Sequence, residues 1–312
     1  MRALQRLRAA FGADPPERRN SPPAAGALDV DHLIRLRHLS LRLEATRAPP
    51  RSSLPGEAAH RRRGRGLEVH DVRAWSEGDD LRHLDRNVTA RTGEPHVRAF
   101  REERERAVLL VADFRPSMVF GTRRVLRAAA AAEVLALLGW RAAREGRVGL
   151  MVLCAEGTRL TRYGRGTRAM LAAIGALAEA YREALSAPAR EDPPLDALLE
   201  EADGLAGKSG ALVVATALDA EGAGFADVVE RIARARGLSF ALIADRFETA
   251  PPRGVYPYAT SGGAAGWLEV GAARPAPDER EARLRRLGAR ALVLDSGAAP
   301  ETTAMELKRL DD

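Results

Sequence analysis

The chain has 312 residues, of which 46% are hydrophobic and 29% charged, a balance typical of a globular protein that can bury a substantial core. The single cysteine, Cys154, excludes an intramolecular disulfide, and the lack of a signal-peptide pattern and of an apolar run of about 18 residues or more indicates a cytoplasmic protein without a membrane span. The net charge of +6 lies within residues 1–106, but only Lys208 and Lys308 among the 49 basic residues are lysine, so a compositional preference for arginine accounts for the high pI without a nucleic-acid partner.

Two segments near the N-terminus, residues 12–26 and 48–64, are rich in proline, glycine and other chain-breaking residues and are typical of flexible connectors. Between them, leucines recur at helical spacing in residues 28–47, with Asp29 or Asp31 available as a cap. We expect a short amphipathic helix that packs against the rest of the chain rather than against a membrane. The run RRRGR at residues 61–65 leaves one alternative open, a basic nucleic-acid-binding protein, although aromatic residues for base stacking make up only 4% of the chain.

From residue 106 onward, apolar strands alternate with helical segments. The predicted strands are 107–113, 147–155, 210–216, 238–244, 266–270 and 289–295, and the predicted helices are 123–144, 167–185, 193–204, 223–236, 278–288 and 300–310. Continuous apolar strands separated by amphipathic helices predict an α/β fold, a doubly wound and mostly parallel sheet covered on both faces. Ligands of such sheets bind beyond the carboxyl ends of the strands, where Asp113 is expected.

The predicted domain organisation has three parts. Residues 1–28 form a flexible N-terminal segment, residues 29–105 a small module with a helix and short strands, and residues 106–312 the α/β domain.

A dense polar segment, residues 64–113, carries the most specific pattern in the chain. Its spaced positions are Gly64, Gly66, Glu68, Arg73, Gly78, Asp79, Asp80, Arg82, Asp85, Ala90, Arg91 and Glu103. This pattern resembles the bacterial family called "domain of unknown function 58", whose members carry the series G-x-G-x-E-F, R-x-Y, G-D-D-x-R-x-I-D-W and A-R before a von Willebrand factor A-like domain. The resemblance is strong over residues 55–160 and weaker beyond. Val69, Trp75 and Arg86 depart from the pattern, which has Phe, Tyr and Trp there.

The motif has two physical interpretations. Gly78, Asp79 and Asp80 predict a turn, because glycine tolerates positive φ and aspartate side chains bond to nearby backbone amides. If the segment folds as a compact hairpin, the motif arginines (Arg73, Arg82, Arg91) reach the motif carboxylates (Glu68, Asp79, Asp80, Asp85). We favour an ion-pair lattice that stiffens a small module with little apolar core; the alternative is a polar surface for a partner.

The loop after the first strand of the α/β domain is the candidate site. The resemblance implies a divalent cation held at the strand end by a D-x-S-x-S loop, a threonine and a further aspartate, and Mg²⁺ prefers such oxygen ligands. Here the loop contains Asp113 and Ser117, but Arg115 replaces the middle hydroxyl; Thr216 and Asp219 follow a later strand, and Thr158 or Thr161 is available from another loop. We expect a degenerate metal-ion-dependent adhesion site of Asp113, Ser117 and Thr216 without metal, with Mg²⁺ binding as the alternative.

We further expect Arg115 to pair with Asp113 in place of the cation and to present guanidinium donors, together with Ser117 and Asp219, to a carboxylate of a partner. Two plainer interpretations stay open, in which Arg115 points to solvent or Asp113 only caps a turn.

No catalytic constellation is found. The six histidines all lie in residues 1–96 without zinc-site spacing, Ser117 lacks the G-x-S-x-G context of a hydrolase, and Cys154 has no basic partner nearby in sequence. The sequence therefore predicts a non-enzymatic protein-interaction adaptor with no cofactor and no nucleic-acid partner. The resemblance implies a MoxR-type AAA+ ATPase as partner and a chaperone-like role in assembling or maturing a target complex. The alternative functions are a Mg²⁺-dependent ligand-binding domain and a nucleic-acid binder.

Overall fold

The computed structural model describes residues 28–44, 67–76, 79–102, 106–187, 191–207, 210–259, 265–271 and 278–310. The chain divides into two compact units, a larger one of Met1–Thr46 and Ala107–Asp312 and a smaller one of Arg47–Arg106.

The larger unit contains both helices and strands. Its helices are α2 (Val30–Arg35), α3 (Arg37–Glu44), α5 (Arg127–Glu145), α6 (Gly166–Ser186), α7 (Leu195–Leu205), α8 (Phe225–Ala235), α9 (Arg246–Thr249), α10 (Arg280–Arg286) and α11 (Pro300–Glu306), with 3-10 turns η2 (Pro116–Met118) and η3 (Leu307–Leu310). Its strands are β3 (Arg106–Asp113), β4 (Gly146–Cys154), β5 (Gly157–Arg165), β6 (Gly210–Thr216), β7 (Leu238–Ala244), β8 (Gly254–Ala259), β9 (Ala265–Val270) and β10 (Arg290–Asp295).

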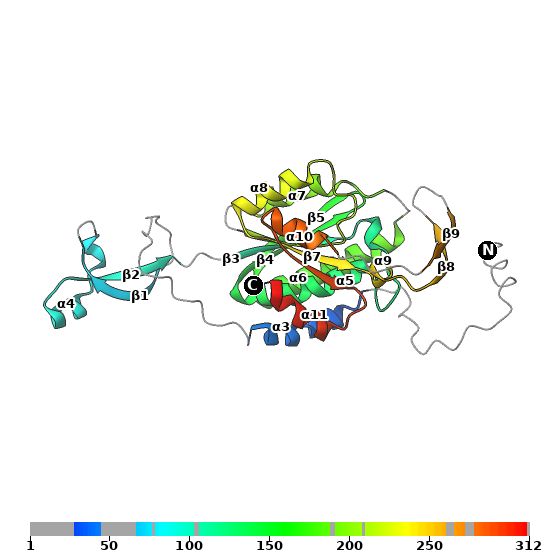
Figure 1. The fold of residues 1–312 in the computed structure, drawn as a ribbon. Helices are drawn as coiled ribbons and strands as arrows, with labels where there is room; N and C mark the ends of the chain where they lie inside the picture. The colour runs from blue at the N-terminus through cyan, green and yellow to red at the C-terminus, as the bar shows by residue number, and fades with distance from the viewer. Residues whose placement is uncertain are drawn as a thin grey trace. The chain divides into compact units, whose positions relative to one another are not determined.

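A six-stranded sheet in the order β10-β7-β6-β3-β4-β5 forms the centre of the larger unit. Strands β10, β7, β6 and β3 pair in parallel, and β5 pairs antiparallel with β4 at the edge. Helices α7 and α8 lie on one side of the sheet and α5, α6 and α11 on the other (Figure 1). The α/β fold with a mostly parallel sheet is therefore confirmed.

Alternate residues of the central strands fill two separate cores. In β3, Leu110 and Ala112 pack in the core that contains α5 and α6, whereas Leu109 and Val111 pack in the core that contains α7 and α8. All four side chains are fully buried. This two-sided burial explains why β3 is a continuous apolar run in the sequence.

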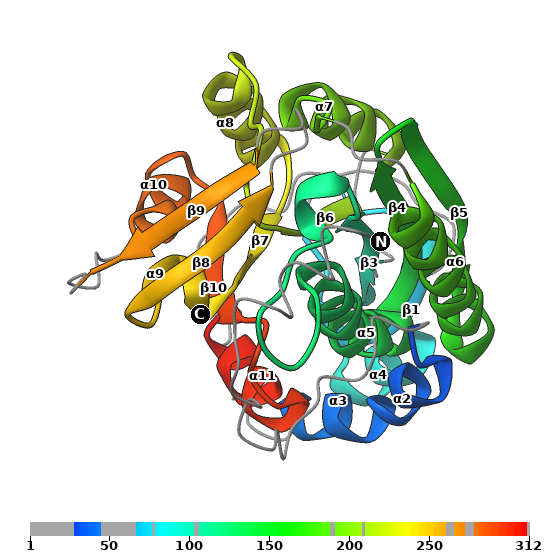
Figure 2. The same cartoon turned by 90° about the vertical axis from the view of Figure 1, so that its right-hand side faces the viewer.

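Three strands of the larger unit differ from the sequence prediction. Strand β5 was not predicted, because its alternating polar residues lie half-exposed at the sheet edge. Strand β8 was not predicted either, and it pairs with β9 in a separate two-stranded ribbon (Figure 2). The strand predicted at 266–270 exists as β9 but lies outside the central sheet, and most of its residues are exposed rather than buried.

The N-terminal segment packs on the rest of the chain, as expected, but it forms two helices, α2 and α3, rather than one, and they pack on the larger unit. Leu33 and Leu36 are buried, and the indole Nε1 of Trp140 in α5 donates a hydrogen bond to the carbonyl of Leu33 at 3.1 Å. Leu41, by contrast, is exposed. Because of this packing, residues 30–44 belong to the larger unit, whereas the sequence prediction placed them in the small module.

Helix α5 approaches its neighbours closely at Gly139. A Cβ atom at this position would lie 2.7 Å from Sδ of Met170 in α6 and 2.8 Å from Cδ1 of Leu110 in β3. A larger residue here would have to displace the buried side chains of Met170 and Leu110, so glycine suits the close packing of α5, although it is an unfavourable residue in a helix interior.

The smaller unit consists of strands β1 (Leu67–Ala74) and β2 (His96–Glu102), which pair antiparallel, with the 3-10 turn η1 (Leu81–His83) and helix α4 (Arg86–Thr92) between them. Asp85 caps α4, since its carboxylate accepts hydrogen bonds from the amides of Asn87 and Val88. Arg86, which departs from the motif, lies exposed in the first turn of this helix, where a charge faces solvent.

The predicted ion-pair lattice of the motif forms in part. Arg73 donates two parallel hydrogen bonds to the Asp79 carboxylate, at 2.8 and 2.7 Å, and the hydrogen bond from Arg73 is the largest cause of a lowered pKa at Asp79. Asp80 accepts a hydrogen bond from the backbone amide of Arg82, and Arg91 is exposed on α4. Gly64, Gly66, Gly78, Glu103 and the side chain of Glu68 lie outside the described residues.

No helix in the described part of the chain has the length and apolar character that a membrane crossing requires.

Candidate functional site

The candidate site lies where β3 and β6 end. Asp113 is the last residue of β3 and Thr216 the last of β6, and the parallel register that pairs Ala112 with Ala215 places them side by side. Both residues are fully buried. The Thr216 hydroxyl donates a 2.7 Å hydrogen bond to Oδ2 of Asp113, so the fold brings together two of the residues that the sequence singled out.

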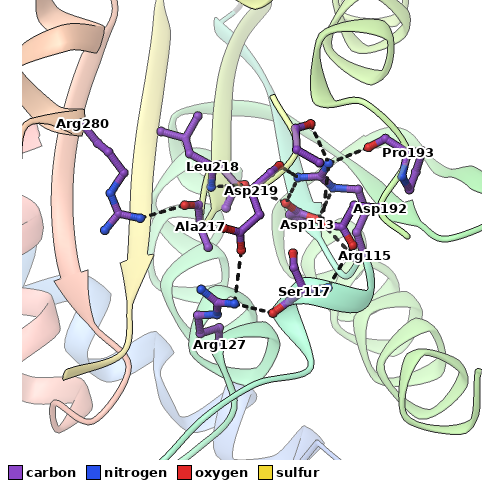
Figure 3. Close-up of polar contacts among 12 residues, drawn as sticks. Asp113, Arg115, Ser117, Arg127, Asp192, Pro193, Ala217, Leu218, Asp219 and Arg280 are labelled. Carbon is purple, nitrogen blue, oxygen red and sulfur yellow. Dashed lines mark hydrogen bonds and ion pairs between the residues drawn. The ribbon is translucent and has the colours of Figure 1, made fainter. Parts of the chain in front are cut away.

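Arg115 is the centre of this site, and its side chain is fully buried. Its Nε and Nη2 donate to the two oxygens of Asp113 at 2.9 and 2.8 Å (Figure 3). Its remaining donors reach three backbone carbonyls, those of Pro193 at 2.7 Å, Asp219 at 2.9 Å and Ala220 at 3.4 Å. A guanidinium group has five N–H donors, and each of them is used within the protein.

Arg115 pairs with Asp113 as predicted, but the expectation that Arg115 presents donors to a partner's carboxylate is wrong. The guanidinium points inward because the loop after β6 and the segment before α7 surround it with acceptors. Burial disfavours its charged form, but the hydrogen bonds and charge of Asp113 outweigh this effect and raise the pKa of Arg115. Arg115 is therefore a permanent cation within the protein, joining three chain segments.

The Asp113 carboxylate has no free acceptor position. Oδ1 accepts from the backbone amide and Nε of Arg115, and Oδ2 accepts from Nη2 of Arg115 and from Thr216. An ionised carboxylate offers about four lone-pair positions, and here all are occupied.

The loop after β6 adopts a strained conformation around Arg115. Leu218 and Ala220 have φ angles of 63° and 46°, a region that residues other than glycine rarely occupy. The strain is held by hydrogen bonds: the amide of Leu218 donates to the Thr216 hydroxyl at 3.0 Å, and the carbonyl of Ala220 accepts from Leu195 at 2.9 Å as well as from Arg115. Such strain persists only where the surroundings fix the backbone firmly.

A second layer of charged groups surrounds this centre. Arg127, at the start of α5, donates to the carbonyl of Ser117 and to the Glu248 carboxylate, and its Nη2 lies 3.2 Å from Oδ2 of Asp219 without the alignment of a hydrogen bond. Burial is the largest influence on Glu248 and raises the pKa of its carboxyl group despite the nearby charge of Arg127. Asp192 accepts a 2.9 Å hydrogen bond from the Ser117 amide.

An open groove of about 1310 Å³ lies beside this cluster. The β3–α5 loop, the β4–β5 turn, the C-terminal part of α6 and residues 191–192 line it. Two buried polar atoms of lining residues, Oγ of Ser117 and Oδ2 of Asp192, have no hydrogen-bond partner in the described part of the chain. Cys154 also borders the groove, and burial is the main cause of the raised pKa of its thiol.

The other predicted residues are distributed around this centre. Ser117 does not bond to Asp113. Its amide donates to Asp192, and Ser117 is one of the residues that line the groove. Asp219 contributes its carbonyl to Arg115 and its carboxylate to Arg127. The Thr158 hydroxyl donates to Glu201 rather than to Asp113.

Sequence reasoning missed Asp192 and Arg127. Asp192 precedes two prolines ahead of α7, a position with no distinctive signal. Arg127 had none either: the sequence placed it inside the helix predicted at 123–144, whereas α5 begins at Arg127, and only the fold shows that it is buried beside Glu248.

Comparison with known proteins identifies the family. The family model described as "Protein of unknown function DUF58" matches residues 71–258, more than half of the chain. The chain belongs to this family. The match begins within β1 and ends within β8, so the DUF58 region contains the motif from Arg73 onward, the Asp113–Arg115 pair and the groove.

The curated relatives of this DUF58 protein are uncharacterised. It is 40% identical over 103 residues to "Uncharacterized protein Rv1480" of Mycobacterium tuberculosis (strain ATCC 25618 / H37Rv) and to "Uncharacterized protein Mb1516" of Mycobacterium bovis. The match covers 32% of this chain and 31% of each relative, so the chain spans about a third of the length of the relatives it matches. A solved structure described as "conserved hypothetical protein BatB from Bacteroides thetaiotaomicron" aligns with a TM-score of 0.43 and 11% identity, over 66% of this chain and 98% of that chain.

Proposed function

We propose that this DUF58 protein is a cytoplasmic, non-enzymatic adaptor with a von Willebrand factor A-like domain that docks a MoxR-type AAA+ ATPase at the strand-end groove. The observation that carries the proposal is the combination of a closed, fully bonded Asp113–Arg115 centre with an open groove beside it. The choice of ATPase, and a chaperone-like role in assembling a target complex, come from the family resemblance.

The site supports binding rather than catalysis. Asp113 cannot act as a base while four hydrogen bonds saturate its carboxylate. The raised pKa of the Cys154 thiol disfavours the nucleophilic thiolate. The hydroxyl of Ser117 has no hydrogen bond to a base in the described residues, so the geometry of an activated nucleophile is missing.

The residues at the strand ends do not fit a divalent cation. A cation between Asp113, Ser117 and Thr216 would need lone pairs that Asp113 already shares with Arg115 and Thr216, and the positive guanidinium lies 2.8 Å from Oδ2. We propose that Arg115 fixes these loops in the way that a bound cation fixes the corresponding loops in metal-binding relatives. The surface is then formed without metal.

The size of the groove favours a polypeptide. Small-molecule pockets usually have volumes of about 300–1,000 Å³ and enclose their ligand, whereas this groove measures about 1310 Å³ and is open. Apolar side chains such as Val119 and Phe120 in its wall supply the contact area that a protein partner requires.

The test is direct binding of the full chain to the purified MoxR-type AAA+ ATPase of the same organism in the presence of ATP. Phe120→Ala removes an aromatic side chain, 37% exposed, from the groove, and we expect it to weaken binding about tenfold or more. Leu205→Ala is the matched control, since Leu205 is 38% exposed on α7 and does not line the groove. Absence of binding by the wild-type chain, or equal loss in both variants, would contradict the proposal.

A further inference from the structure

The floor of the groove carries acceptors that no group in the described residues satisfies. The Asp192 side chain is only 6% exposed, and its Oδ2 has no hydrogen-bond partner. The nearest cationic atom, Nη1 of Arg115, is 4.0 Å away and donates to carbonyls instead. Oγ of Ser117 is a second unsatisfied buried atom in the same groove. Buried polar groups without partners are rare and unfavourable, so Oδ2 of Asp192 and Oγ of Ser117 each lack, within the described residues, a hydrogen bond that a ligand can supply.

The charged residues that line the groove indicate whether the ligand group that donates these hydrogen bonds is cationic or neutral. Four carboxylates line it (Glu156, Glu183, Glu191, Asp192), against two guanidinium groups (Arg127, Arg159). Arg159 pairs with Glu183, so these two charges cancel, whereas Arg127 pairs with Glu248, which does not line the groove. The other lining carboxylates are Glu156, Glu191 and Asp192, the last of them 4.0 Å from the buried Arg115. The groove therefore has an excess of negative charge, which attracts a cationic ligand.

The walls of the groove define what surrounds the cation. Phe114, Val119, Phe120, Ala184 and Leu185 also line the groove and give it apolar surface. A small cation such as a free amine or metal ion would leave these walls uncovered. A polypeptide segment with a basic side chain between apolar residues matches both the floor and the walls.

We propose that the groove binds a partner segment through an arginine or lysine side chain that donates to Oδ2 of Asp192 and Oγ of Ser117. The inference deepens the proposed adaptor function, on which it rests for the partner being a protein. It reverses the charge expected from the sequence: Arg115 already occupies the cationic position inside the protein, and the groove that a partner meets has more carboxylates than guanidinium groups in its lining.

The experiment is selection of peptides from a random display library on the immobilised full chain, followed by affinity measurement with one synthetic peptide of the selected sequence. We expect selected peptides to carry a basic residue flanked by apolar ones. Asp192→Asn removes the charge but keeps an oxygen that can accept from the Ser117 amide, and we expect about tenfold or greater loss of affinity. Asp227→Asn, which removes the same charge from an exposed position on α8 outside the groove, should leave the affinity unchanged.

A peptide with a neutral residue, citrulline for arginine or acetyl-lysine for lysine, completes a double-mutant cycle. Its binding to wild type should fall by the same factor, and Asp192→Asn should weaken it no further. Ser117→Ala provides a second variant should Asp192→Asn unfold. Selection of acidic peptides, selection of none, or basic peptides that bind both variants as well as wild type would overturn the proposal.

The two proposals fail separately. An ATPase that binds in a Phe120-dependent manner but is unaffected by Asp192→Asn would preserve the adaptor function and overturn the basic-ligand inference. Basic peptides that depend on Asp192, without any ATPase binding, would overturn the adaptor function instead.

Discussion

Removal of the Arg115 side chain is expected to destabilise the larger unit severely. In Arg115→Ala, the buried Asp113 carboxylate keeps hydrogen bonds only from a backbone amide and from Thr216, and three carbonyls lose a donor. Breaking a buried ion pair by deleting one partner typically costs about 3–5 kcal/mol, because it leaves an uncompensated charge. Set against a total stability of about 5–15 kcal/mol for a folded domain, this loss is a large fraction.

Urea unfolding of the full chain, followed by tryptophan fluorescence, measures this loss, since Trp140 is buried in the core next to α2. Arg123→Ala is the control: Arg123 is exposed in the same loop, and its removal should change the free energy of unfolding by no more than about 0.5 kcal/mol. Arg115→Lys should fall between the two, because lysine cannot form the two parallel bonds to Asp113. Equal stability of Arg115→Ala and Arg123→Ala would refute the role assigned to Arg115.

Three further predictions concern the same unit. Millimolar Mg²⁺ should leave the thermal midpoint of the wild type unchanged. Arg115→Ser opens space beside Asp113 and adds a hydroxyl, so millimolar Mg²⁺ should raise the thermal midpoint of this variant above its own metal-free value. A Mg²⁺-dependent rise in the wild type that Asp113→Ala abolishes would contradict the metal-free site. Gly139→Ala should lower the free energy of unfolding by about 1–3 kcal/mol, despite the better helix propensity of alanine, because the added methyl overlaps Met170. A variant that proves more stable than wild type in urea unfolding would disprove the close packing. The raised pKa of Glu248 means that its favourable contribution to the free energy of unfolding is complete below about pH 4.5 and is lost as pH rises through the folded-state pKa. In urea titrations, the stability of wild type relative to Glu248→Gln should therefore fall between pH 4 and pH 8. A rise in this relative stability over the same range would show that the sign is wrong.

The architecture of the larger unit was predictable from the sequence because its strands are buried on both faces. Strands β3, β6, β7 and β10 appear as continuous apolar runs, and the long helices between them carry regular apolar spacing. The edge strand β5 and the ribbon of β8 and β9 are half-exposed, so they lack that signal. The place of α2 and α3 was also beyond the sequence, since an apolar stripe does not specify the surface that it covers.

Some members of the candidate site were predictable from the sequence, but Asp192, Arg127 and the direction in which the Arg115 guanidinium points were not. The sequence indicated that Asp113 and Arg115 pair, because the arginine replaces a hydroxyl two residues after a strand-end carboxylate. Whether the guanidinium points outward depends on the carbonyls of Pro193, Asp219 and Ala220, which come from segments about 80 to 105 residues away. Backbone acceptors have no signature in the sequence, and only the fold places them around Arg115.

Hydrogen exchange of the full chain, with and without the purified MoxR-type AAA+ ATPase and ATP, tests the docking surface most directly. The adaptor account predicts slower exchange in the segments that line the groove, residues 116–120, 154–159 and 180–187, while the amides of the central strands stay unchanged. Unchanged exchange throughout, or protection confined to residues 67–102 of the smaller unit, would contradict docking at the strand-end groove.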